Sequence, residues 1–296
     1  MPKTKNPILI VSLILLGIIL FLGIALTCIL SIFTPFTDLT FRDQIGVIPI
    51  EGTISDSRSV ISSLIKYKKD KRIKAIILRI NSPGGSVAPT QEIYQEVRKT
   101  IVTKTVIASM SGVAASGGYY IAAATDKIVA NPGTITGSIG VMIKFMRIEE
   151  LLDRIGINFE IFKSGCFKDT GSPHRKVTEQ DRELIQALVL DIKRQFVQDV
   201  SVGRNLPVEK VQKLSDGRIF TGAQAEEVGL VDSLGNFQDA VAIAKEMANI
   251  DGEVVLIYPK KSSGSLLDMF FKKAVNSFIE SSHGVKGNLE YRWNGF

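Results

Sequence analysis

The stretch TVIASMSGVAASGGYY, residues 105–120, joins an apolar β-branched run to a turn of small residues and then to the start of a helix. Residues 105–109 are typical of a buried strand. A serine at the turn, Ser116, presents its Oγ to a cleft, and the amide of Gly117 points the same way. This geometry suits a nucleophile. The alternative is that Ser116 only caps the helix and the glycines only permit close packing.

The same alternation of strand and helix continues along the chain. Strands are expected at residues 45–50, 74–80, 105–109, 127–130, 159–162 and 253–258. Helical patterns lie between them, and the clearest begins at Thr178, where Asp181 stands at the position that completes a capping box. This order predicts an α/β fold with buried, largely parallel strands and helices on both faces.

The N-terminus carries a long apolar segment. No charged residue occurs from Pro7 to Thr37, and this run exceeds the roughly 20 residues that span a bilayer as a helix. Lys3 and Lys5 precede the run and Asp38 follows it, so the positive-inside rule places the N-terminus in the cytoplasm and the globular part outside. We therefore expect a single-pass protein of the cell membrane with an extracytoplasmic catalytic domain.

Four regions follow from this pattern. They are a cytoplasmic N-terminus (1–7), a transmembrane helix (8–36), a globular domain (37–258) and a C-terminal tail with an amphipathic helix (259–296). A cleaved signal peptide is the first alternative for the apolar run, but the run is longer than a normal signal-peptide core and lacks a clear cleavage site. A lipoprotein acylated at Cys28 is the second alternative, and Thr27 fits it poorly.

Composition narrows the classes of function. The chain has 296 residues, 45% of them hydrophobic, and a formal net charge of +6, which suits a sizeable core. Without Lys3 and Lys5, 34 basic residues face 30 acidic ones (36 − 2 = 34), or +4, and no basic arm stands out. Nucleic-acid binding therefore gains little support. The only cysteines, Cys28 and Cys166, exclude a disulfide framework and a cysteine-rich zinc site.

A second glycine-rich run is RINSPGGSV, residues 79–87. A strand that ends in Asn-Ser-Pro-Gly-Gly must turn sharply, and its two glycines bring backbone N–H groups close to anything bound there. These amides suit the binding of an oxyanion. The alternative is an ordinary turn between a strand and a helix.

A nucleophilic serine needs a base, and the histidines are poor candidates. His283 lies in the polar tail, and His174 lies in a loop where Asp169 is the only clear carboxylate to orient it. Lysine serves as a base when burial lowers its pKa enough to leave the amine neutral. Lys168 is the candidate, although a lysine in a loop is more often simply solvated.

Five segments occur in an order and at a spacing that identify a family resemblance: NSPGG, AASGGYYIA, NPGTITGSIGV, KSG..KD and GRIFTGAQAEEVGLVDSLG. Over roughly residues 43–248, the chain resembles the SppA-type signal peptide peptidases. These are single-pass membrane serine proteases with the Clp protease/crotonase-like β-α superhelix, and the resemblance implies that fold here.

The resemblance also implies roles for particular residues. Ser116 matches the nucleophile, and Lys168, 52 residues downstream (168 − 116), matches the general base. Gly85 and Gly117 match the amide donors of the oxyanion hole. Ser138 matches a serine that hydrogen-bonds the lysine amine in relatives, with an ordinary turn hydroxyl as the alternative.

The expected activity is therefore a serine endopeptidase with a Ser/Lys dyad. It would degrade cleaved signal peptides and other hydrophobic peptides, contact membrane lipid, form a homo-oligomeric ring and need no metal or other cofactor. Two rival interpretations stay open. A crotonase-like acyl-CoA enzyme would use the same glycine amides on a thioester, and a catalytically inactive membrane scaffold would share only the fold.

Overall fold

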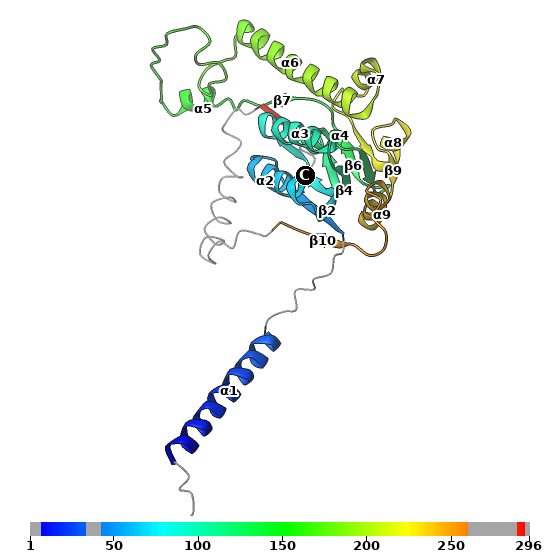
Figure 1. Ribbon diagram of the computed structural model, residues 1–296. Coiled ribbons are helices and arrows are strands. Elements are labelled where there is room, and N and C mark those ends of the chain that lie inside the picture. Colours follow the sequence, from blue (N-terminus) through cyan, green and yellow to red (C-terminus); the bar gives the residue numbers. More distant parts are fainter. Residues whose placement is uncertain (1–6, 34–42, 260–288, 294–296) are drawn as a thin grey trace, which may run out of the picture. The chain divides into compact units, whose positions relative to one another are not determined.

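The computed structural model describes residues 7–33, 43–259 and 289–293 (Figure 1). The chain divides into two compact units, Met1–Phe41 and Arg42–Phe296. The first contains helix α1 (Pro7–Phe33), which covers most of the predicted transmembrane segment. Within the residues described with their side chains, no helix has the length and hydropathy that crossing a membrane requires. The predicted membrane span stays a prediction.

The second unit is built on a mainly parallel sheet, as the sequence predicts. Along the sheet the strands are β10 (Val255–Ile257), β1 (Gln44–Glu51), β2 (Ile73–Ser82), β4 (Thr105–Ala115), β5 (Lys127–Ala130) and β9 (Ser233–Leu234), all paired in parallel. β6 (Ile135–Gly137) also pairs with β4 in parallel, and its other neighbour, β8 (Ile219–Thr221), runs antiparallel to it.

Helices cover both faces of this sheet (Figure 1). α2 (Arg58–Lys69), α3 (Val87–Ile101) and α4 (Gly117–Ala123) lie on one face, and α9 (Phe237–Met247) lies on the other. The other helices of this unit are α5 (Glu149–Arg154), α6 (Glu179–Arg204), α7 (Val208–Lys213) and α8 (Gly222–Glu227). Successive strand residues enter opposite cores: Ile76 packs on the side of α2, α3 and α4, and Ile77 packs on the side of α9. Burial on both faces explains the continuous apolar runs in the sequence.

The strand predicted at residues 159–162 is wrong. These residues form no strand, and all four are exposed, with Phe162 90% exposed. An alternating pattern gives a strand only where a neighbouring strand completes the hydrogen bonds, and this segment has none among the described residues.

The prediction for the start of α6 is confirmed. The Thr178 hydroxyl accepts from the Asp181 N–H at 3.1 Å, and the Asp181 carboxylate accepts from the Thr178 N–H at 3.0 Å.

A small second sheet was not predicted. Its order is β3 (Gly84–Ser86), β11 (Leu289–Arg292) and β7 (Met142–Ile143), so the C-terminal strand lies in the middle and pairs antiparallel with both neighbours. In Figure 1 it is the red strand beside β7. The amphipathic helix predicted for the tail falls on residues 260–288, outside the described residues.

Candidate active site

Ser116 stands at the junction of β4 and α4 in an uncommon backbone conformation. Its φ is 53° and its ψ is −114°, a combination that costs a non-glycine residue about 1–3 kcal/mol. Two hydrogen bonds hold it there: its N–H donates to the Gly137 carbonyl at 2.8 Å, and its carbonyl accepts from the Tyr120 N–H at 2.8 Å. The hydroxyl makes no capping hydrogen bond to α4. Helix capping therefore does not account for this serine.

The two glycine-rich runs meet at Ser116, as expected for a shared site. Ser82, at the end of β2, pairs with Ala114 near the end of β4. Gly84 has a φ of 100°, and a Cβ added to it would lie 2.7 Å from the Gly117 amide nitrogen. Only glycine allows this approach of two backbones. The site therefore places the amide of Gly117 against the Pro-Gly-Gly turn.

Ser138 lies at the end of the neighbouring strand. It follows Gly137, which pairs with Ala115, so Ser116 and Ser138 occupy the carboxyl ends of adjacent parallel strands, where α/β proteins bind ligands. Ser138 has a φ of 51° and is 8% exposed, and its N–H donates to the Arg218 carbonyl at 2.8 Å. No hydrogen bond between the Ser138 hydroxyl and another described residue indicates its role.

Lys168 lies in the loop between α5 and α6 and is exposed. Its own N–H closes a turn to the Gly165 carbonyl at 3.2 Å. In the part of the single chain that the structure describes, no hydrogen bond joins Lys168 to Ser116 or Ser138. The single chain therefore does not supply the burial that the sequence analysis expects around Lys168.

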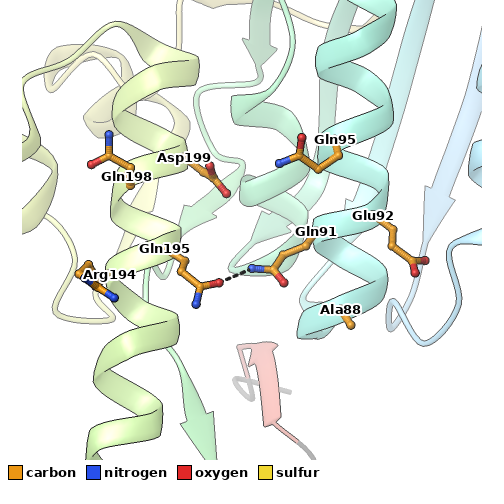
Figure 2. A pocket seen from close by; sticks show the side chains of 8 residues that line it. All are labelled: Ala88, Gln91, Glu92, Gln95, Arg194, Gln195, Gln198 and Asp199. Carbon is orange, nitrogen blue, oxygen red and sulfur yellow. Dashed lines mark hydrogen bonds between the residues drawn. The ribbon is translucent and has the colours of Figure 1, made fainter.

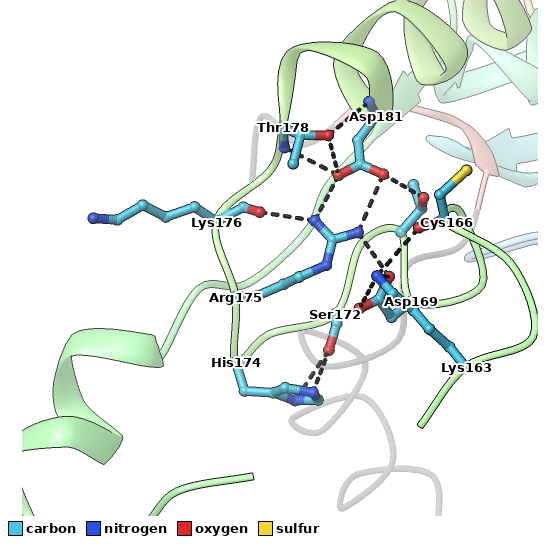
Figure 3. A network of polar contacts seen from close by, with 10 residues as sticks. Lys163, Cys166, Asp169, Ser172, His174, Arg175, Lys176, Thr178 and Asp181 are labelled. Atoms are coloured by element: carbon cyan, nitrogen blue, oxygen red, sulfur yellow. Dashed lines mark hydrogen bonds and ion pairs between the residues drawn. The ribbon is translucent and has the colours of Figure 1, made fainter. Parts of the chain in front are cut away.

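An ionic network fixes the residue that follows Lys168 (Figure 3). The guanidinium of Arg175 donates to Asp169 at 2.9 Å and to Asp181 at 2.6 Å, and Lys163 donates to Asp169 at 2.8 Å. Hydrogen bonds from Arg175 are the main cause that lowers the pKa of both carboxyl groups. Because Asp181 belongs to the first turn of α6, Arg175 ties the Lys168 loop to that helix.

This network also explains why His174 is a poor candidate for the base. Asp169, the carboxylate expected beside it, is engaged by Lys163 and Arg175 instead. The His174 ring contacts the Ser172 hydroxyl at 3.0 Å and stacks on Phe159 at 4.6 Å. His283 lies outside the described residues.

Tyr291 is a site residue that the sequence analysis missed. It belongs to β11 and is fully buried, with ring centroids 5.1 Å from Tyr120 and 4.8 Å from Phe196. Its hydroxyl donates to the Ile192 carbonyl at 3.3 Å. The alternation of Leu289, Tyr291 and Trp293 in LEYRW is the signal of a strand, but it lies in a segment otherwise typical of a polar tail.

A pocket of about 660 Å³ opens between α3 and α6 (Figure 2). Every lining residue except Ala88 has a polar side chain. The amide of Gln91 donates to Gln195 at 3.0 Å, and Glu92 and Asp199 also line the pocket. Tyr120 donates to the Asp199 carboxylate, whose pKa burial raises. None of the predicted site residues lines this pocket. Among the described residues, no cluster of acidic, histidine or cysteine side chains is arranged to hold a metal ion.

Comparison with known proteins gives two family matches and several relatives. Residues 99–251 match peptidase family S49, and residues 44–144 match the N-terminal domain of NfeD1b. A Synechocystis sp. protein named "Putative protease" is 43% identical over 75% of this chain and 80% of its own length. An Enterococcus faecium protein named "Putative signal peptide peptidase SppA" is 38% identical over 70% of this chain and 60% of its own. The "Serine protease SPPA, chloroplastic" of Arabidopsis thaliana is 35% identical over 84% of this chain and 39% of its own.

Proposed function

Because this chain belongs to peptidase family S49, we propose that it is a membrane-anchored serine endopeptidase with Ser116 as nucleophile and Lys168 as general base. The observation that carries the proposal is the strained, buried Ser116 at the point where two glycine-rich turns and a third strand end converge. Strain of this kind is retained at functional sites. Family membership also supports a Clp protease/crotonase-like superhelix for the α/β domain.

The reaction proceeds in two stages. Neutral Lys168 takes the proton from Ser116 as its Oγ attacks the carbonyl carbon of the peptide, and the amides of Gly85 and Gly117 stabilise the oxyanion, each by about 3 kcal/mol. The intermediate collapses, the peptide C–N bond breaks, and Lys168 protonates the leaving amine. Lys168 then deprotonates a water molecule that attacks the acyl-enzyme and releases the acid, which restores Ser116.

The base that serves Ser116 comes from a neighbouring copy of the chain. Lys168 is exposed in the single chain, and its loop carries apolar side chains that water does not favour, such as Phe162 at 90% and Phe167 at 43% exposed. A second copy packed on this loop would bury both the apolar groups and the amine, and burial lowers a lysine pKa. Ser138 would then orient the neutral amine, and a closed ring of copies repeats the contact.

Hydrophobic peptides, including signal-peptide remnants, are the substrates that this placement suits. The apolar α1 would anchor the chain in the cell membrane with its N-terminus in the cytoplasm, which brings an extracytoplasmic site to the surface where such remnants arise. The names of the Enterococcus faecium and Arabidopsis thaliana relatives support a signal peptide peptidase and a serine protease, respectively.

The test is hydrolysis of a synthetic signal peptide by the full chain in detergent, together with labelling by a fluorophosphonate probe. Ser116→Ala and Lys168→Ala should each lower kcat at least about 10³-fold, and only Ser116→Ala should remove the labelled residue. Ser62→Ala and Lys71→Ala, at exposed positions on α2 and in the turn before β2, are the controls. Turnover of an acyl-CoA that survives Ser116→Ala would favour the crotonase-like alternative. A wild-type chain that neither labels nor cleaves would favour the inactive scaffold.

A further inference from the structure

The C-terminal strand β11 lies next to Gly117, the residue that follows Ser116. It lies between β3, which carries Gly85 of the proposed oxyanion hole, and β7. On the β3 side, Glu290 lies opposite Ser86, Tyr291 opposite Gly85 and Arg292 opposite Gly84. On the β7 side, Leu289 lies opposite Ile143 and Glu290 opposite Met142. Addition of an extended segment to exposed strand edges is a general way of binding peptides.

The carbonyl of Tyr291 lies where the proposed mechanism needs a substrate carbonyl. The Trp293 N–H donates to the Pro83 carbonyl at 2.8 Å, and hydrogen-bonded pairs alternate along an antiparallel ladder. Tyr291 and Gly85 are therefore the next such pair. A Cβ added to Gly117 would lie 3.1 Å from the Tyr291 carbonyl oxygen, so that oxygen sits beside the residues that supply both proposed amide donors.

The side chain of Tyr291 anchors the strand. Its ring is fully buried between Tyr120 and Phe196, and its hydroxyl reaches the Ile192 carbonyl. Three aromatic rings in contact form a pocket shaped for a flat side chain. A peptide with a tyrosine or phenylalanine at this place would make the same contacts.

Other features indicate that the occupant is replaceable. Among the described residues, β11 pairs only with two short strands and takes no part in the main sheet. The Nε of Arg292 is buried and has no acceptor among the described residues, which disfavours this occupant relative to one that lacks the donor. A peptide without that group would lose nothing by taking its place.

We propose that Leu289–Arg292 is an internal ligand of the peptide-binding groove, and that the groove selects extended peptides with an aromatic side chain at the place of Tyr291. The proposal rests on the proposed function only in assigning the groove to the substrate. A tethered segment competes at an effective concentration of about the millimolar range. A substrate must displace β11 before its own carbonyl can reach Ser116.

The test of occupancy uses Trp293, the single tryptophan of the chain, and needs no catalysis. In full-length protein carrying Ser116→Ala, acrylamide quenching of the half-buried Trp293 should be weaker than that of a free tryptophan peptide. Saturation with a synthetic peptide of residues 288–296 that carries Trp293→Phe should raise the quenching constant at least about threefold, towards that of a free tryptophan peptide. The same peptide with Tyr291→Ala should have little effect at equal concentration. Unchanged quenching with both peptides would overturn the proposal.

Variants of the full chain give the second measurement. Tyr291→Ala should expose Trp293 to quenching without added peptide, and Tyr291→Phe, which keeps the ring, should match the parent chain. Circular dichroism shows whether each variant stays folded. The peptide titration does not depend on these variants. In the active background, Tyr291→Ala should lower the apparent KM for a tyrosine-containing peptide about tenfold if β11 occupies nine grooves in ten, with kcat unchanged.

The two proposals fail in different ways. Displacement of Trp293 without hydrolysis by any variant would contradict the peptidase and leave the internal ligand in place. Hydrolysis with identical KM in the wild type and Tyr291→Ala, together with quenching that no peptide alters, would overturn the internal ligand and leave the peptidase.

Discussion

Backbone strain at single residues marks the candidate site. Ser116, Ser138 and Gly84 all have positive φ, at 53°, 51° and 100°, and each follows the end of a different parallel strand. The two glycine-rich runs predicted a shared site for Ser116 and Gly84, and the family resemblance implied that Ser138 belongs to it. The sequence did not predict the strain at Ser138, because a serine after a glycine is common in ordinary turns.

The conformation of Ser116 predicts that only one of two inactivating substitutions raises stability. Ser116→Gly removes the hydroxyl and relieves the positive φ, so we expect loss of peptidase activity and a free energy of unfolding higher by about 1 kcal/mol. Ser116→Ala should lose activity equally and gain nothing, because alanine keeps the Cβ. Thermal unfolding of the two full-length variants in detergent compares them. A glycine variant less stable than the alanine variant would contradict the strain.

Arg175 predicts how two carboxyl groups titrate. Its hydrogen bonds lower the pKa of Asp169 and Asp181 below the usual value of about 3.9. The stabilisation by this network is therefore present above the unfolded-state pKa and is lost as the pH falls through the lower folded-state values. In Arg175→Gln, the carboxyl ¹³C resonances of both residues should titrate at higher pH than in the wild type. Lys163→Ala is the control, and it should move Asp169 alone.

Whole elements were predicted well where burial sets the pattern and poorly where a distant partner does. The runs that became β1, β2, β4 and β5 are apolar on both faces, so they admit no other placement than the centre of a sheet. Residues 159–162 show a similar short run but have no strand beside them. β11, by contrast, was not predicted and does form a strand. Its partners, β3 and β7, are more than a hundred residues away in the chain, and no local pattern reveals such a pairing.

The crossing of α4 and α6 predicts a cost for one methyl group. Gly203 lies in α6, and a Cβ there would stand 2.0 Å from the Ala123 carbonyl oxygen of α4. Alanine normally stabilises a helix interior by about 1 kcal/mol relative to glycine, but overpacking here should give a net loss of about 1–3 kcal/mol. Gly133→Ala, where nothing lies within 4 Å, should change the free energy of unfolding by less than about 0.5 kcal/mol. Denaturant titration measures both, and a stabilised Gly203→Ala would refute the close contact.

At the scale of the molecule, the described part of a single chain forms no hydrogen bond between its proposed catalytic groups, and it leaves apolar side chains exposed to water. Leu151, Ile155, Phe159 and Phe162 are 59%, 58%, 58% and 90% exposed. All lie on the segment that carries Lys168. Exposed apolar groups gathered on one segment are typical of a protein interface, and a second copy is the partner that would also complete the site.

Phe162→Asp therefore predicts a linked loss of assembly and activity. Because Phe162 is 90% exposed, the charge should leave the single chain folded while disfavouring the contact between copies. We expect a smaller mass in analytical ultracentrifugation and a kcat lower by at least about 10²-fold. Val102→Asp, at a position 81% exposed at the end of α3, should change neither the mass nor kcat.

Mixing denatured Ser116→Ala and Lys168→Ala chains and refolding them together shows which copy supplies the base. If each site joins Ser116 of one copy to Lys168 of the next, random assembly restores about a quarter of wild-type activity, whereas sites built within one chain restore none.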